Sequence, residues 1–254
     1  MTISLGTRIF LFAAIFLAGG VDSIAGGGGL ISLPAYVFAG LPMHLAYGTN
    51  KFGNMFGTVF ASLHFAKKKK ILWKATVFAV PASLIGSWLG AKITLLLTEH
   101  VLSLCLLIIL PVASVFMLFG TKKIEKGDRK MLEGGKLLTA SVVVGFFCGA
   151  YDGFFGPGTG TFLVLGFTSL VGMDFVMSSG TAKILNLASN IGALFVFLRS
   201  GDVFISLGLQ CALCSILGNL IGAKLATDKG AKVIKPIIVL VIAAVMIKLV
   251  LQFF

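Results

Sequence analysis

The sequence predicts an all-α polytopic membrane protein built from two inverted repeats of five segments each. Three observations lead to this prediction: a mean hydropathy of +1.05 with only 12% charged residues, long apolar runs along the whole chain, and sequence blocks that occur twice. A soluble domain has about twice that charged fraction. Runs such as 71–91, 101–120 and 233–254 are each long enough to cross a bilayer, which takes about 20 residues. The net charge of +12 then fits cationic loops on the cytoplasmic side of a membrane and does not indicate nucleic acid as a partner.

The duplication is visible in three blocks that keep their order. "GTNKFGN" (48–54) aligns with "GTAKILN" (180–186), and "GSWLGAK" (86–92) aligns with "GNLIGAK" (218–224), both at an offset of 132. "DSIAGGGG" (22–29) aligns with "DGFFGPGT" (152–159) at an offset of 130. We therefore expect a first repeat at 1–120, a charged cytoplasmic linker at 121–135, and a second, inverted repeat at 136–254.

Hydropathy divides each repeat into five segments, of which the second is short. The expected segments are 6–22, 30–43, 45–66, 72–97 and 101–119, then 136–151, 161–173, 176–198, 203–225 and 233–253. The run at 6–22 lacks a convincing cleavage site and is interpreted as a span, not as a signal peptide. A segment of about 13 residues makes only about 20 Å of helix, against a hydrocarbon core of about 30 Å. Each short segment therefore either dips into the membrane and returns, or crosses with help from non-helical backbone at its glycine-rich end.

The charges of equivalent loops favour inversion of the repeats. Lys67–Lys70 and Lys74 follow the third segment of the first repeat, whereas only Arg199 follows its counterpart. After the fourth segment the bias is reversed, with Lys92 alone in the first repeat and Lys224, Lys229, Lys232 and Lys235 in the second. Because positive residues collect in cytoplasmic loops, equivalent loops on opposite sides of the membrane explain this exchange. We expect ten segments with both termini outside.

The glycine-rich stretches and two lysines form the candidate substrate site. Each stretch leads into a helix N-terminus, whose N–H groups and positive dipole end favour an anion, and glycine lets the backbone approach a ligand closely. The shared pattern G-T-x-K-x-x-N adds a hydroxyl, an ammonium and an amide, which suit an oxyanion. The competing interpretations are close helix packing for the glycines and snorkelling to the headgroups for the lysines. The predicted substrate-binding residues are Gly26, Gly27, Gly28, Gly29, Thr49, Lys51, Asn54, Gly156, Gly158, Gly160, Thr181, Lys183 and Asn186.

Asp22 and Asp152 precede the two glycine stretches, either as proton-coupling carboxylates or as caps of local backbone. No metal-ligand spacing, nucleophile–histidine–acid arrangement or nucleotide-binding pattern accompanies them, so we expect no metal, no cofactor and no enzymatic activity. The four cysteines, including the pair Cys211 and Cys214, lie in apolar runs and are expected to pack in the interior.

The two glycine-rich stretches and the residues around them resemble a known family. "AGGGGLISLPAYVFAGLPMHLAYGTNKFGN" (25–54), with its counterpart around "GAYDGFFGPGTGTFLVLGF" (149–167), is similar to the sulfite exporter TauE/SafE family of anion permeases, over essentially the full chain. The resemblance implies a multi-pass protein of the cytoplasmic membrane that transports small sulfur-containing anions such as sulfite or organosulfonates, in many members by export. Pro157 lies inside the second glycine stretch, so the two stretches need not be equivalent in function.

The leading hypothesis is a secondary transporter of a small oxyanion, with a proton or sodium ion as the possible coupling partner and the lipid bilayer as its surroundings. A passive anion channel is the alternative, and a membrane scaffold would leave the paired lysines unexplained. The sequence leaves the anion, the direction of transport and the oligomeric state open.

Overall fold

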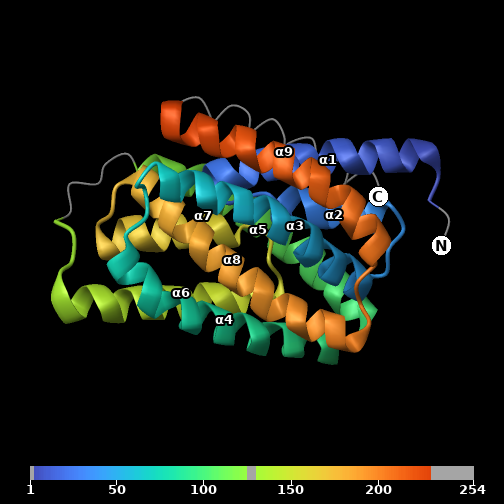
Figure 1. The fold of residues 1–254 in the computed structure, drawn as a ribbon. Helices are drawn as coiled ribbons and strands as arrows, with labels where there is room; N and C mark the ends of the chain where they lie inside the picture. Colours follow the sequence, from blue (N-terminus) through green and yellow to red (C-terminus); the bar gives the residue numbers. More distant parts are fainter. Residues whose placement is uncertain (1–2, 125–129, 230–254) are drawn as a thin grey trace.

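The structure is a computed structural model, and it describes residues 3–124 and 130–229 (Figure 1). These residues form helices and no strands. The helices are α1 (Leu5–Ala25), α2 (Gly29–Phe38), α3 (Met43–Lys67), α4 (Trp73–Leu96), α5 (Glu99–Ile124), α6 (Gly134–Phe154), α7 (Thr159–Gly166), α8 (Phe175–Ser200) and α9 (Ile205–Lys229). A π-helical turn, η1 (Phe167–Val171), extends α7. Each of the first nine expected segments coincides with one of these helices, and the tenth, 233–253, lies outside the described residues.

Within residues 3–124 and 130–229, five helices are long and apolar enough to cross a membrane, namely α1, α4, α6, α8 and α9. The helix α3 is as long as these but less apolar, because it contains polar residues such as Asn50, Lys51 and Asn54, which face the interior of the protein or are only partly exposed. The helix α2 has only 10 residues, and α7 with η1 has 8 and 5. At 1.5 Å per residue, about 15–20 Å of helix is too short for a hydrocarbon core of about 30 Å. The prediction of short second segments is therefore confirmed for the described residues.

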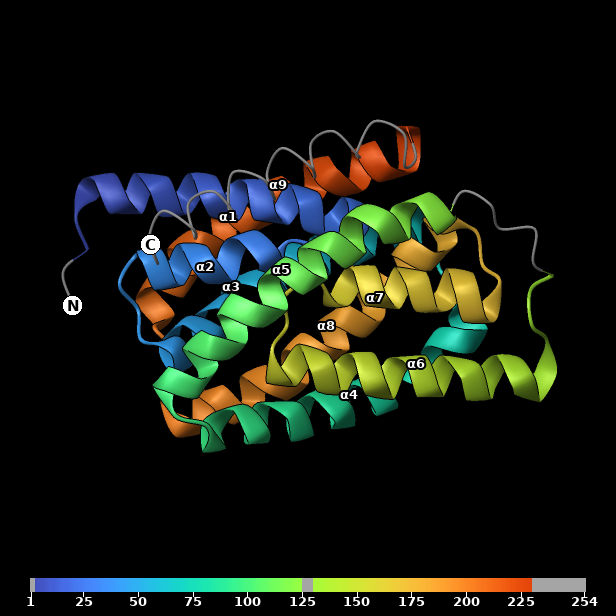
Figure 2. The same cartoon turned by 180° about the vertical axis from the view of Figure 1, so that it is seen from behind.

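The two halves of the chain are interleaved. The helix α1 packs against α9 on one side of the molecule and α6 packs against α4 on the opposite side, while α3 and α8 lie between these two pairs (Figures 1 and 2). The helix α3 contacts α9 and α8, and α8 contacts α4. Every one of these layers therefore joins a helix from the N-terminal half to one from the C-terminal half.

Small residues allow the outer pairs to pack closely. A Cβ atom built on Gly86 or Gly90 of α4 would lie 2.3 or 2.1 Å from a carbonyl oxygen of α6. The aligned Gly218 and Gly222 of α9 approach carbonyl oxygens of α1 in the same way, at 2.0 and 2.3 Å. Close backbone approach through glycine is the usual way in which helices associate in lipid.

Equivalent helices run in opposite directions. In Figure 1, α1 and α3 run from right to left along the chain, whereas α6 and α8 run from left to right, and Figure 2 shows the same from behind. The loop after α3 and the loop after α8 consequently lie at opposite ends of the molecule (Figure 1).

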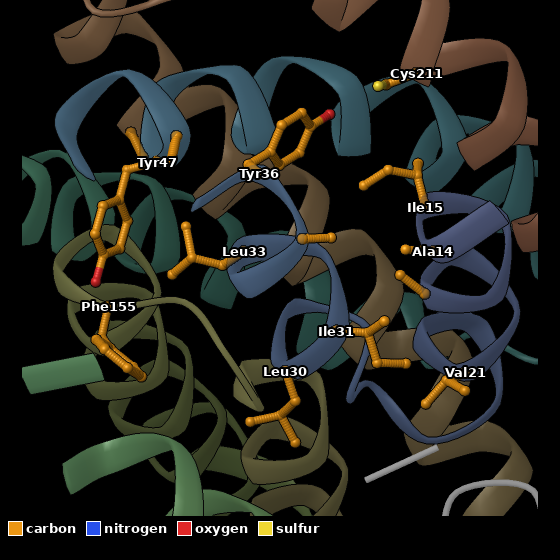
Figure 3. Packing of buried hydrophobic residues seen from close by; sticks show 14 of the residues in the cluster. Ala14, Ile15, Val21, Leu30, Ile31, Leu33, Tyr36, Tyr47, Phe155 and Cys211 are labelled. Atoms are coloured by element: carbon orange, nitrogen blue, oxygen red, sulfur yellow. The ribbon is translucent and has the colours of Figure 1, made fainter. Parts of the chain in front are cut away.

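The short helix α2 is held in the interior by apolar contacts. Leu30, Leu33 and Tyr36 are at most 1% exposed. In Figure 3, α2 lies between Ala14, Ile15 and Val21 of α1 on one side and Tyr47 and Phe155 on the other. This packing holds a helix that cannot span a membrane alone, and it fixes the glycine-rich stretch at its N-terminus.

Candidate functional site

The two glycine-rich stretches meet at the centre of the molecule. Gly26 ends α1 with a φ of +74°, and Gly156 and Gly158 connect α6 to α7 with φ of +89° and +86°. A Cβ on Gly26 would lie 2.0 Å from the carbonyl carbon of Gly160, and a Cβ on Gly29 would lie 2.9 Å from Cα of Pro157. Only glycine is tolerated where positive φ and backbone-to-backbone contact coincide. The N-termini of both short helices therefore begin at one common point.

The two predicted lysines are paired with the two predicted aspartates, each across the halves of the chain. Lys51 Nζ lies 2.7 Å from Asp152 Oδ2, and Lys183 Nζ forms the corresponding pair with Asp22 Oδ2. All four residues are at most 5% exposed. The sequence offered coupling or capping as roles for the aspartates, and the structure adds ion pairing to these. The site as a whole is therefore electrically balanced, and neither lysine presents an unpaired charge.

Two small adjoining cavities lie at this centre, each with space for roughly one water molecule. The first is lined by Asp22, Gly26, Gly29, Asn50, Lys51, Asn54, Asp152, Gly156, Gly160, Asn186 and Asn190. The second is lined by Asp22, Ser23, Ile24, Gly26, Gly160, Val164, Ser179, Ala182, Lys183 and Asn186. The structure thus brings eight of the thirteen predicted substrate residues to these cavities, together with both aspartates.

The other predicted residues lie elsewhere. The Thr49 hydroxyl accepts a 2.9 Å hydrogen bond from the Phe204 N–H, and the Thr181 hydroxyl accepts a 3.1 Å bond from the Leu72 N–H. Thr49 therefore holds the loop that leads into α9, and Thr181 holds the loop that leads into α4. Neither threonine lines the cavities. Gly27, Gly28 and Gly158 form the turns into α2 and α7, and they are also absent from the lining.

Part of the N-terminal backbone of the short helices is already hydrogen-bonded. The N–H groups of Leu30 and Ile31 donate to the carbonyl oxygens of Gly27 and Gly28, and that of Thr159 donates to Gly156. The positive dipole end remains, and its field acts on the cavities. The side chains of the ion pairs and of the asparagines therefore add to a backbone that is only partly available for ligand chemistry.

Three residues at the centre were missed by the repeat-based reasoning. Ser189 Oγ donates to Asp152 Oδ2 at 2.6 Å, and Asn50 and Asn190 line the first cavity. Asn50 is 7% exposed, and its Oδ1 has no hydrogen-bond partner. A search restricted to residues that occur in both repeats excludes all three, because their aligned positions are Gly57, Ala182 and Thr58.

Comparison with known proteins assigns the chain to a family. The family model described as "Sulfite exporter TauE/SafE" matches residues 11–249. The chain belongs to the sulfite exporter TauE/SafE family. Since the match includes both glycine stretches and both lysines, the resemblance seen in the sequence is confirmed.

Relatives of this TauE/SafE protein are named as probable membrane transporters. It is 39% identical over 244 residues to "Probable membrane transporter protein ORF9" of Sinorhizobium sp, covering 94% of this chain and 91% of that protein. It is 34% identical over 239 residues to "Probable membrane transporter protein YfcA" of Escherichia coli strain K12, covering 94% and 88%. No solved structure gave a significant match. The TauE/SafE chain is thus a multi-pass membrane protein whose relatives are named as probable transporters.

Proposed function

We propose that this TauE/SafE protein is a secondary transporter of a small sulfur-containing oxyanion, such as sulfite or an organosulfonate, and that it works as an exporter. The observation that supports this most is the pair of buried Lys–Asp ion pairs where the two helix breaks meet. A lysine at membrane depth is costly and usually serves a substrate or ion pathway. The TauE/SafE membership indicates the sulfur-containing class of anion.

The ion pairs also suggest how transport is coupled to an ion gradient. A substrate anion and an aspartate carboxylate compete for the same ammonium group. Protonation of the carboxylate removes its charge, and the lysine then pairs with the anion. The anion and a proton are therefore carried in the same direction. Export is then driven by the outward gradient of the anion, and an imposed proton gradient drives accumulation in the direction of proton flow. The groups in the chain that can take these roles are the ammonium groups of Lys51 and Lys183, the amides of Asn54 and Asn186, and the carboxylates of Asp22 and Asp152.

Alternating access follows from an inverted-repeat architecture, with boundaries at 1–120 and 136–254. The opposite directions of α1 and α6, and of α3 and α8, support this architecture. So do the reciprocal bonds of Thr49 and Thr181, whose positions and whose partners differ by the same offset of 132. In transporters with such repeats, one part rocks against the other around a site near the bilayer midplane.

The proposed location is the cytoplasmic membrane, with both termini outside and the linker at 121–135 in the cytoplasm. The lysine-rich loop after α3 then lies in the cytoplasm, and the loop after α8 lies outside. The opposite ends at which these loops lie support this topology.

The test is flux in proteoliposomes that contain the full chain. We expect radiolabelled sulfite to accumulate against its own gradient when a proton gradient is imposed. The double variant Lys51→Met with Asp152→Asn should abolish accumulation while leaving no unpaired buried charge. Sulfite flux that only follows its own gradient, under imposed proton and sodium gradients alike, would identify a passive channel. No flux of sulfite or methanesulfonate would refute the proposed function.

A further inference from the structure

The two ion pairs occupy different chemical surroundings, although their four residues align between the halves. Asp152 Oδ2 receives two donors, Lys51 Nζ at 2.7 Å and Ser189 Oγ at 2.6 Å. These two groups converge on one oxygen atom and define a position for a negatively charged oxygen. Such charge-assisted hydrogen bonds are about twice as strong as neutral ones.

The corresponding position beside Asp22 lacks this second donor. Gly57 aligns with Ser189, and glycine has no hydroxyl group. The nearest serine in the chain to Asp22, Ser23, donates to Asn219 Oδ1 at 2.6 Å. At this position the Lys183–Asp22 pair therefore has one hydrogen-bond donor fewer than the Lys51–Asp152 pair.

The amide groups are distributed in the same unequal way. Asn50 precedes Lys51, whereas Ala182 precedes Lys183. Asn50 and Asn190 line the cavity that contains Lys51 and both aspartates, and they are absent from the lining of the cavity at Lys183. Asn50 is more than nine-tenths buried, with an unpartnered Oδ1. A buried polar side chain is nearly always hydrogen-bonded, so the amide of Asn50 requires a partner that the described residues do not supply. Because the amide has donors at one end and an acceptor at the other, a half-turn of the group can direct its N–H donors to an oxyanion.

We infer that the transported oxyanion binds at Lys51 alone, where it replaces the Asp152 carboxylate and accepts hydrogen bonds from Ser189 and Asn50. Lys183 stays paired with Asp22 and holds α8 to α1. The inference rests on the proposed function and adds that this TauE/SafE chain has one anion site and not two equivalent sites. In the present structure the Asp152 carboxylate occupies the place of the anion, which explains why the cavity is small.

The test is equilibrium binding of inorganic sulfite to the purified full chain, measured by calorimetry. Asn50→Ala and Ser189→Ala should each raise the Kd for sulfite about tenfold, the usual effect of losing one hydrogen bond to a charged group. The matched control is Ser179→Ala, which alters the cavity at Lys183 and should leave the Kd unchanged. Asn50→Ala removes an unsatisfied polar group, so the variant should retain the thermal stability of the parent.

A third variant tests the replacement of the carboxylate. Asp152→Asn should lower the Kd for sulfite, because no carboxylate then competes for Lys51. An equal loss of affinity in Ser179→Ala, or an unchanged Kd in both Asn50→Ala and Ser189→Ala, would overturn the single-site inference. So would an unchanged or raised Kd in Asp152→Asn. In each of these cases wild-type sulfite accumulation would still support the proposed function, whereas failure of the wild-type chain to bind or transport any anion would refute both.

Discussion

Breaking the Lys51–Asp152 pair should destabilise the protein far more when one partner is removed than when both are neutralised. The Nζ–Oδ2 distance is 2.7 Å, and the two side chains are 4% and 3% exposed. At an effective dielectric constant of 20, two unit charges at this distance attract by about 6 kcal/mol. Part of this is offset by the desolvation of both groups. Removal of one partner from a buried pair typically costs about 3–5 kcal/mol, because the other charge stays buried and unpaired.

The expected shifts follow from these magnitudes. For a chain of this size, about 1 kcal/mol changes the unfolding temperature by about 2–4 °C. Lys51→Met or Asp152→Asn alone should therefore lower the apparent unfolding temperature by roughly 6–20 °C. The double variant replaces a charged pair by a neutral one of similar volume and should lie within about 4 °C of the parent.

The assay is thermal unfolding of the four proteins in one detergent at one scan rate, since unfolding of such proteins is often irreversible. The double-mutant cycle gives the interaction energy of the pair directly. Single and double variants whose shifts simply add would mean that the two side chains do not interact, and the cross-half ion pair would be wrong. Double variants in the Lys183–Asp22 pair provide the comparison for the second ion pair.

Three further predictions concern the backbone, the loops and the topology. Gly26→Ala should prevent folding to the native state, because Gly26 has a φ of +74° and a Cβ there would collide with the N-terminal backbone of α7. The control Gly6→Ala places its Cβ in open space and should leave expression and monodispersity unchanged. Thr49→Val should destabilise the chain by about 1–3 kcal/mol, because the Phe204 N–H just before α9 loses its acceptor. The Kd for sulfite should not change, and a large change in this Kd would place Thr49 in the site. In a chain without its native cysteines, an impermeant thiol reagent in intact cells should label Asp202→Cys but not Lys69→Cys, and the reverse pattern would contradict the proposed orientation.

Much of the fold was predictable because the bilayer imposes strong local constraints. Helical segments must be apolar, and the first nine are visible in the hydropathy of the sequence, although α2 ends at Phe38 and not at 43. The glycine stretches were equally visible, and the structure shows that α1 ends at Ala25 and α2 begins at Gly29. The duplication also identified the four charged residues, since repetition marks positions that local chemistry alone does not distinguish.

The pairing of those residues was not predictable from repetition. An alignment of two repeats shows which positions correspond, but it contains no information on which ones touch. Lys51 lies 101 residues from Asp152 in the chain (152 − 51), and their contact depends on α6 and α8 both packing against α4 while α3 packs on α8. For the same reason the sequence suggested two cationic contacts for an anion, where the fold has two neutralised pairs.

By itself the sequence determined that this TauE/SafE protein lies in a lipid bilayer. It also determined the helical segments, the internal duplication and the residue types at the centre. These are properties of composition and spacing, which hydrocarbon and backbone hydrogen bonding restrict closely. Only the tertiary structure decided that each lysine is matched by the aspartate of the other half and that both threonines hold loops. It also decided that Asn50, Ser189 and Asn190 lie around Lys51 and Asp152 and not around Lys183. The physical reason is that a buried charge takes as its partner whatever group the packing of the helices brings within about 3 Å.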